Sequence, residues 1–373
     1  MTTATQKIPT GYKQTEIGII PADWDVKPLR EISYLKGRIG WQGLNQSEFT
    51  MNPEEPFLIT GMNFKDGAIR WDEVYHVSIE RFEIAKDIQL RPNDVLMTKD
   101  GTIGKLLFVS AIPYPGKASL NSHLLVFRPI RGSYHPKYLY YLLSSRAFKD
   151  HTELNKSGST FFGLSQEAVS GFLVALPTKP EQIAIATSIS DIDILIEKYE
   201  GLIQKKKNIK QGTMQGLLTG KQRLPGFVGK WEIKKLGEIA EFNHGRDLPK
   251  SDLSEDGPYK CIHYGQLFNE YKELISGIKS RTHRNAGRFY SKANDVLIPT
   301  SDVTPRGLAT ASCIKEDGVI LGGGILVIRL HSGYDGLYFS YFVSQNKNSV
   351  LRFVKGSTVF HLYANDLANF EVG

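Results

Sequence analysis

The chain has 373 residues, more than one hydrophobic core usually supports, so we expect two or three domains. Its 46 lysines and arginines against 39 acidic residues give a net charge of +7, which allows an anionic partner without identifying one. The N-terminus lacks the apolar core of a secretory signal, and no run of about 18 apolar residues exists, so neither export nor a membrane span is predicted.

The first predicted unit, residues 1–176, mixes short strands with a few helices, which is typical of an α/β (mixed α+β) domain. The segments 103–111 and 123–130 are rich in β-branched and aromatic residues and are predicted strands. Residues 134–150 carry tyrosines and leucines at helical spacing and form a predicted helix. We expect the aromatic side chains of this helix to lie in the core.

Polar loops of this unit place cations beside small residues, a combination that suits contacts to phosphate or to base edges. The loop at 96–109 has two glycines that allow close backbone approach, and the segment 155–164 combines a lysine, a glycine and hydroxyls. A polar hairpin turn and a helix N-cap are the alternative interpretations of these segments. The candidate contact residues are Arg38, Lys99, Thr102, Lys105, Lys156, Ser159 and Thr160.

Residues 177–220 are predicted to form one long helix. Pro177 and Pro180 suit a helix start, where the missing N–H of proline is not needed. From Glu181 to Thr219 the helix would extend roughly 58 Å at about 1.5 Å per residue. Its apolar residues recur at alternating spacings of four and three, which is typical of a coiled-coil seam. The seam consists of Ile185, Ile189, Ile192, Ile196, Tyr199 and Ile203.

This narrow seam must be buried against another surface. Packing on the helix's own domain is one interpretation. We expect instead a helix from another chain, either a partner protein or a second copy of this chain in a homodimer.

The residues after the helix, 221–373, repeat the first unit. WDVKPLREISYLKG at 24–37 resembles WEIKKLGEIAEFNHG at 231–245, and Asn-Asp-Val-Leu at 93–96 returns at 294–297. The offset between matching segments changes slowly and in order, as expected for two copies of one domain. The second copy supplies its own candidate contact residues: Arg246, Ser301, Arg306, Lys355, Ser357, Thr358 and His361.

The repeat is expected to be incomplete. Gly373 matches Ala175, the position just before the long helix of the first copy. The sequence therefore predicts two globules and one helix, where two full copies would supply two helices. The partner of the seam would come from another chain, or the chain is a shortened product.

Motifs of intrinsic chemistry are absent from the sequence. There is no Asp/Asn-Pro-Pro-aromatic motif of amino-methyltransferases, no dinucleotide fingerprint, no GxSxG elbow and no HExxH. Cys261 and Cys313 lack metal-ligand spacing and are expected to be buried free thiols in a reducing cytosol. We therefore expect no catalytic residue, no metal site and no cofactor in this chain.

The segments YKQTEIGIIPADWDVKPL at 12–29 and PEQIAIATSISDIDILIEKYEGLIQKKKNIKQGTMQGLLTGKQRLPGF at 180–227 resemble the specificity subunit of type I restriction-modification enzymes. The paired Asn-Asp-Val-Leu and Gly-Ser-Thr segments share this resemblance, which covers essentially the whole chain. It implies two target-recognition domains, each reading one half of a split, asymmetric site on double-stranded DNA. The domains are separated by long antiparallel helices that set the gap between the half-sites.

The resemblance also implies partners. The helices dock methyltransferase subunits, which carry S-adenosylmethionine and methylate adenine at N6. Separate motor-nuclease subunits use ATP and Mg²⁺ to cut unmodified DNA, and the specificity subunit itself is not catalytic. Such complexes act in the cytoplasm of bacteria and archaea. This sequence departs from the family pattern after Gly373, where the distal helix is missing.

Two other functions are compatible with the residues alone. One is a DNA-modifying enzyme module with an unrecognised catalytic site, which would turn over S-adenosylmethionine or cut DNA unaided. The other is a protein-interaction scaffold, which would show neither DNA affinity nor a steep dependence on salt.

Overall fold

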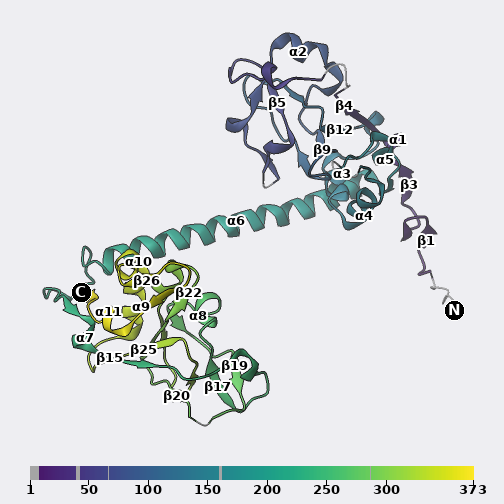
Figure 1. The fold of residues 1–373 in the computed structure, drawn as a ribbon. Coiled ribbons are helices and arrows are strands. Elements are labelled where there is room, and N and C mark those ends of the chain that lie inside the picture. Colours follow the sequence, from purple (N-terminus) through teal and green to yellow (C-terminus); the bar gives the residue numbers. More distant parts are fainter. Residues whose placement is uncertain (1–7, 39–42, 66, 159–161, 286) are drawn as a thin grey trace. The chain divides into compact units, whose positions relative to one another are not determined.

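The computed structural model describes residues 8–38, 43–65, 67–158, 162–285 and 287–373. The chain divides into two compact units, Met1–Tyr199 and Glu200–Gly373. One long helix, α6 (Lys179–Leu217), contributes residues to both units (Figure 1). Across these described ranges, no helix is both long and apolar enough to span a membrane.

The first unit is built on a four-stranded antiparallel sheet in the order β10-β9-β12-β4. Successive strand side chains point to opposite faces, and both faces of this sheet are buried. Val95 and Phe127 pack on the helical side, whereas Leu96 and Val126 pack toward a second sheet. The strands are β4 (Ser33–Gly37), β9 (Val95–Thr98), β10 (Leu106–Phe108) and β12 (Leu124–Pro129).

The second sheet of this unit has the order β11-β5-β8, and its β5 and β11 run parallel. Its strands are β5 (Phe57–Ile59), β8 (Tyr75–His76) and β11 (Ala118–Leu120). Three two-stranded pairs complete the unit: β1 (Tyr12–Thr15) with β2 (Gly18–Pro21), β3 (Asp25–Pro28) with β13 (Leu173–Leu176), and β6 (Phe64–Lys65) with β7 (Ala68–Ile69).

The helices of the first unit are short apart from α6. They are α1 (Leu29–Ile32), α2 (Ile79–Ile84), α3 (Pro136–Leu143), α4 (Arg146–Asn155) and α5 (Gln166–Ser170). Single 3₁₀ turns are η2 (Gln46–Glu48), η3 (Gly61–Asn63), η4 (Trp71–Glu73), η5 (Lys86–Ile88) and η6 (Ile130–Gly132).

The second unit repeats the first. Its main sheet, β15-β25-β21-β23-β18, contains the same strand order as β4-β12-β9-β10 with one added edge strand. The prediction of two similar α/β units in tandem, joined by one long helix, is therefore confirmed. The strands are β15 (Ala240–His244), β18 (Leu274–Ile275), β21 (Val296–Pro299), β23 (Ser312–Ile314) and β25 (Ile325–Leu330).

A second five-stranded sheet has the order β16-β19-β17-β24-β20. It consists of β16 (Leu253–Ser254), β17 (Tyr259–Ile262), β19 (Ser280–Thr282), β20 (Phe289–Tyr290) and β24 (Ile320–Leu321). A small sheet, β22-β27-β26, is formed by β22 (Ser301–Asp302), β26 (Val354–Gly356) and β27 (Phe360–Leu362). The chain ends in a pair of β14 (Lys234–Lys235) with β28 (Glu371–Val372).

The helical elements of the second unit lie beside these sheets. They are α7 (Leu236–Ile239), α8 (Gln266–Asn269), α9 (Gly336–Gln345), α10 (Lys347–Leu351), α11 (Ala364–Leu367), and the 3₁₀ turns η7 (Lys250–Asp252) and η8 (Pro305–Ala309).

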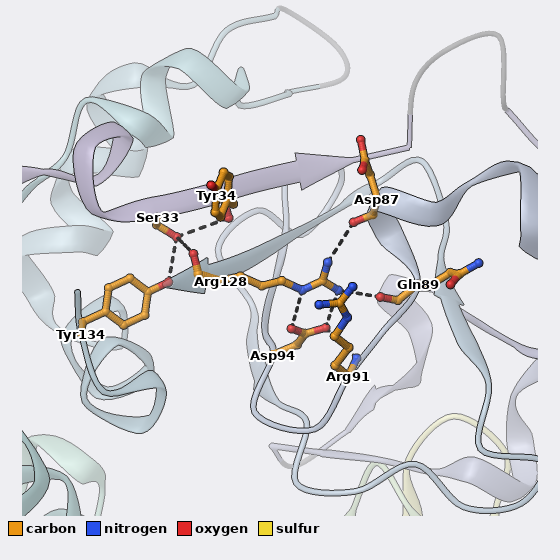
Figure 2. A network of polar contacts seen from close by, with 8 residues as sticks. All are labelled: Ser33, Tyr34, Asp87, Gln89, Arg91, Asp94, Arg128 and Tyr134. Carbon is orange, nitrogen blue, oxygen red and sulfur yellow. Dashed lines mark hydrogen bonds and ion pairs between the residues drawn. The ribbon is translucent and has the colours of Figure 1, made fainter. Parts of the chain in front are cut away.

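The Asn-Asp motif of both copies forms the same buried ion pair. Arg128 Nε lies 2.7 Å from Asp94 Oδ1, and its second nitrogen lies 2.7 Å from Oδ2; Figure 2 shows the two groups face to face. In the second unit, Arg329 binds Asp295 in the same bidentate way, at 2.8 and 2.7 Å. The equivalence extends to the backbone, since the preceding asparagine has positive φ in each copy.

One predicted element is wrong in detail. The expected single helix over 134–150 is two helices, α3 and α4, which meet at Ser144 and Ser145. Ser145 has extended backbone and its Oγ accepts a hydrogen bond from Phe148 N–H, so it caps the start of α4. Serine is among the preferred N-cap residues because its hydroxyl satisfies a free N–H of the first turn.

Both cysteines are buried free thiols, as predicted. Burial raises the pKa of Cys261 to about 11 and also raises the pKa of Cys313. A thiol reacts as its thiolate, so a raised pKa keeps both groups protonated and inert near neutral pH. We expect a thiol reagent at pH 8 to label neither cysteine in the native chain and both after unfolding in guanidinium. Rapid labelling of one thiol without denaturant would show that its site opens in the native state.

Candidate nucleic-acid interface

An open groove of about 820 Å³ lies on the first unit, between the loops that follow β5, β9 and β11. Two of the predicted contact residues, Thr102 and Lys105, line it and are exposed. Its walls also carry the exposed apolar side chains of Met62, Tyr75 and Phe162. The groove therefore combines cationic, hydroxyl and apolar groups, which suits the mixed edge of a nucleic-acid groove.

The loop that follows β9 is held in a fixed turn by Thr98. The Thr98 hydroxyl donates to the carbonyl of Thr102 and accepts the N–H of Lys105 at 3.0 Å. Gly101 and Gly104 have φ of +70° and +82°, a conformation that glycine adopts without strain. The two glycines are thus needed for the turn that presents Lys105.

Lys99 and Lys156, two further predicted contact residues, each form an ion pair with an acidic side chain. The Lys99 ammonium is 3.7 Å from an Asp100 oxygen, and Lys156 forms an ion pair with Glu153. Lys156 also lies 5.2 Å from the centre of the Phe162 ring. Both ion pairs are partly exposed, so DNA phosphates could replace the carboxylates at modest cost. Ser159 and Thr160 lie outside the described residues.

Arg38 does not have the exposed position expected of a DNA contact. Its side chain is buried, with 6% of its surface exposed, and its Nε donates to Leu120 O at 2.8 Å. A second guanidinium nitrogen donates to Ser119 Oγ at 3.0 Å. Burial, with the nearby charge of Arg81, lowers the pKa of Arg38 to about 10, so it remains charged at neutral pH. The structure therefore places Arg38 as a support for β11.

In the second unit, the small sheet β22-β27-β26 brings three predicted residues together. Ser301 is the direct partner of His361 in one ladder, and Lys355 is its direct partner in the other. Directly opposed residues of neighbouring strands share one face of a sheet. The hydroxyl, the imidazole and the ammonium therefore form one polar row, in which Lys355 also pairs with Asp366 at 2.8 Å.

The other predicted residues of this unit lie around the row or away from it. Ser357 and Thr358 are exposed on the turn that joins β26 to β27. Arg306 is exposed on η8 and lines a separate polar hollow of about 320 Å³ with Lys347. Arg246 is exposed in the loop after β15, where its N–H donates to Leu321 O.

Two residues of the groove were missed by the sequence reading. His123 Nδ1 lies 3.1 Å from Asp100 Oδ2, and both side chains line the groove. Asp100 belongs to the predicted loop, but its negative charge gives no signal of a contact to phosphate, which attracts cations and hydroxyls. His123 is the first residue of the predicted strand 123–130, and its distance from Asp100 along the chain gave no sign that the two side chains meet. In the regions that the structure describes, no cluster of three His, Cys, Asp or Glu side chains could hold a metal ion.

The predicted helix seam divides into a covered part and an open part. In the first unit, α3 packs on the start of α6: Lys137 Nζ binds Ser190 Oγ at 2.6 Å, and Tyr141 OH binds Asp193 at 2.7 Å. Ile185 and Ile189 are accordingly half-buried. The later seam residues are about half exposed: Ile192, Ile196, Tyr199 and Ile203.

Within the second unit, a lysine of α6 contacts residues that lie outside the helix. The Lys210 ammonium lies 3.7 Å from Glu273 and 5.2 Å from the centre of the Tyr341 ring. Exposed Leu195, Leu202 and Ile209 widen the open stripe between the two packed ends of the helix. An apolar stripe of this kind is typical of a helix that packs on another helix.

A family model and the sequences of related proteins all match this chain to one family. The model of the type I restriction modification DNA specificity domain matches residues 21–208 and again 229–373. The specificity subunit assigned to the MjaX type I restriction enzyme of Methanocaldococcus jannaschii is 28% identical, with 97% of this chain and 85% of that protein covered. The MjaIX specificity subunit of the same organism is 25% identical, with 78% and 72% covered.

Solved structures share the fold. The crystal structure of the S subunit of a type I restriction-modification system from M. genitalium has a TM-score of 0.57 at 14% identity, covering 94% of this chain and 84% of that one. A chain from a study of complex assembly in the type I system has a TM-score of 0.52 at 16% identity, with 94% and 86% covered. With its two units each matching the family's domain, the chain belongs to the type I restriction-modification DNA specificity family.

Proposed function

We propose that this chain is the DNA-recognition subunit of a type I restriction-modification complex. Each unit reads one half of a split, asymmetric site on double-stranded DNA. The observation that carries this proposal is one framework present twice, with different side chains at matching loop positions. Two equal frameworks with different contact residues suit two different half-sites, because base edges are read by side chains.

The helix α6 sets the spacing between the half-sites and docks methyltransferase subunits. Those subunits bind S-adenosylmethionine and transfer its methyl group to adenine N6, while motor-nuclease subunits use ATP and Mg²⁺. This chain supplies no catalytic group and acts in the cytoplasm. Support comes from the relatives, whose names describe specificity subunits of type I restriction enzymes.

The open stripe on α6 is covered by a helix from another chain. Four seam residues remain about half exposed, and their burial would be favourable at about 25 cal/mol per Å². A methyltransferase subunit and a second copy of this chain are the two candidates. Light scattering of the purified chain separates them, since only the second gives a dimer without another protein.

The enzyme-module and scaffold interpretations are less well supported. The relatives do not support the enzyme module, because their names describe specificity subunits of type I restriction enzymes. A groove that combines cations, hydroxyls and apolar groups suits the edges of DNA bases, which a pure protein-interaction scaffold does not bind.

The test is a genome-wide map of N6-methyladenine in the source organism, with this gene intact and deleted. We expect one split, asymmetric motif to vanish on deletion and to return when the gene is supplied again. A motif with two identical halves would mean that units from two chains share one site. An unchanged map would overturn the proposal for this chain.

A further inference from the structure

We propose that a row of three directly opposed residues on neighbouring strands determines which base each unit reads. The residues of this row differ between the two units. The row consists of Asp100, Gly163 and Ser157 in the first unit and of Ser301, His361 and Lys355 in the second. This inference rests on the proposed function, because it assigns specificity within the DNA-reading units.

The backbone shows that the two rows are equivalent. In the first unit Lys99 N–H donates to His123 O, and Lys99 O accepts Leu164 N–H at 2.8 Å. In the second unit Thr300 makes the same two bonds, donating to Gly324 O and accepting Leu362 N–H at 3.0 Å. Asp100 and Ser301, the first residues of the two rows, directly follow Lys99 and Thr300. The two rows therefore occupy equivalent positions in their units.

The turn beside each row confirms this register. Gly158 and Gly356 both have strongly positive φ, +116° and +123°, and each follows the third residue of its row. Ser157 is therefore equivalent to Lys355, and Lys156 is equivalent to Val354. The two lysines of the sequence motif are therefore one position out of step: Lys355 belongs to the row, whereas Lys156 caps the end of α4.

In each row, one large side chain lies opposite a small residue. A β-carbon built on Gly163 would lie only 3.0 Å from Asp100 Oδ1, so the aspartate extends over the glycine. In the second unit the small Ser301 lies opposite the large His361. At the first two positions, the large polar group therefore comes from a different strand in each unit: a carboxylate in the first and an imidazole in the second. Lys355 adds an ammonium group at the third position of the second row.

The chemistry of the two rows is opposite. Asp100 offers acceptors, and no described residue donates to its Oδ1, whereas its Oδ2 faces His123. A carboxylate in a DNA groove accepts from an exocyclic amino group, such as cytosine N4. His361 and Lys355 offer N–H donors, which match the N7 and O6 acceptors of guanine. The first row therefore selects an amino-bearing base edge, and the second selects an acceptor-bearing edge.

Exposure and surroundings support a reading role. Asp100 and Gly163 line the open groove together with exposed Thr102 and Lys105. Nearby cations offset the repulsion between Asp100 and DNA phosphates, since Lys99 lies 3.7 Å away. In the second row, Lys355 is exposed and the His361 ring stacks near Tyr363 at 6.0 Å.

The test exchanges the first two positions of each row in the complete complex. The chain is expressed with its methyltransferase subunit, and N6-methyladenine is mapped in the host genome. The variant Asp100→Ser with Gly163→His should change only one half-site, with a loss of roughly 5- to 150-fold at the original base. The reverse exchange, Ser301→Asp with His361→Gly, should change only the other half-site.

Controls separate the possible failures. Asp100→Asn keeps the size of the side chain and removes its charge, so it tests the first row if the exchange variant does not fold. Lys272→Ala, an exposed lysine of the second unit, should leave both half-sites unchanged. If the unaltered chain directs no methylation, the proposed function itself fails. If the unaltered chain gives a motif and every folded row variant gives the same motif, the row does not read bases.

Discussion

Replacing Ile196 and Tyr199 together by aspartate should abolish stable assembly of this chain with the helix that covers α6. Both residues are more than half exposed, at 51% and 57%, and neither is needed by the packing of its own unit. Fully burying such a side chain stabilises a complex by about 1.5–3 kcal/mol, and a carboxylate at the same position must be desolvated. We expect the dissociation constant to rise by at least about 100-fold.

The measurement is co-purification and light scattering, with and without the methyltransferase subunit. Gln204→Asp places the same carboxylate on the opposite side of the helix, three or four residues from no stripe position, and should leave assembly unchanged. Ile189 is a poor test position, because it is half-buried and a substitution there would disturb its own unit. Wild-type assembly by the double aspartate variant, at unchanged helical content, would show that this stripe is not the interface.

Asp295→Ala should strongly destabilise the second unit. Asp295 is 1% exposed and holds Arg329 through two hydrogen bonds. Its carboxylate also raises the pKa of Arg329, mainly through that hydrogen bond. Removing one partner of a buried pair leaves the other charge uncompensated, at a cost of about 3–5 kcal/mol. For a domain stable by about 5–15 kcal/mol, this is a large fraction.

Urea unfolding followed by tryptophan fluorescence and circular dichroism measures this loss. Asp94→Ala should cause a similar loss in the first unit, because Arg128 makes the equivalent pair there. Asp256→Ala is the matched control, since Asp256 pairs with His283 on the surface, where ion pairs contribute little. A midpoint for Asp295→Ala equal to that of the control would mean that the buried pair is dispensable.

The candidate contacts show where reasoning from sequence reaches its limit. Arg38 and Arg246 each follow a glycine at the end of equivalent strands, β4 and β15, yet Arg38 is buried and Arg246 is exposed. The partners of Arg38 are Ser119 and Leu120, which are distant in sequence, so no local pattern could show its burial. Arg306 lies beside residues of α6 and α10, which are also distant from it in sequence, so its surroundings could not be predicted either.

The sequence by itself determined the tandem repeat, the main strands and the long helix. These features depend on periodicity and on order along the chain, which near neighbours set. Only the tertiary structure decided where the predicted helix over 134–150 breaks, which part of the α6 seam stays open, and which polar residues share a face. In a strand a shift of one residue reverses the direction of every side chain. The register of Lys156 against Lys355 therefore depends on ladders between distant segments.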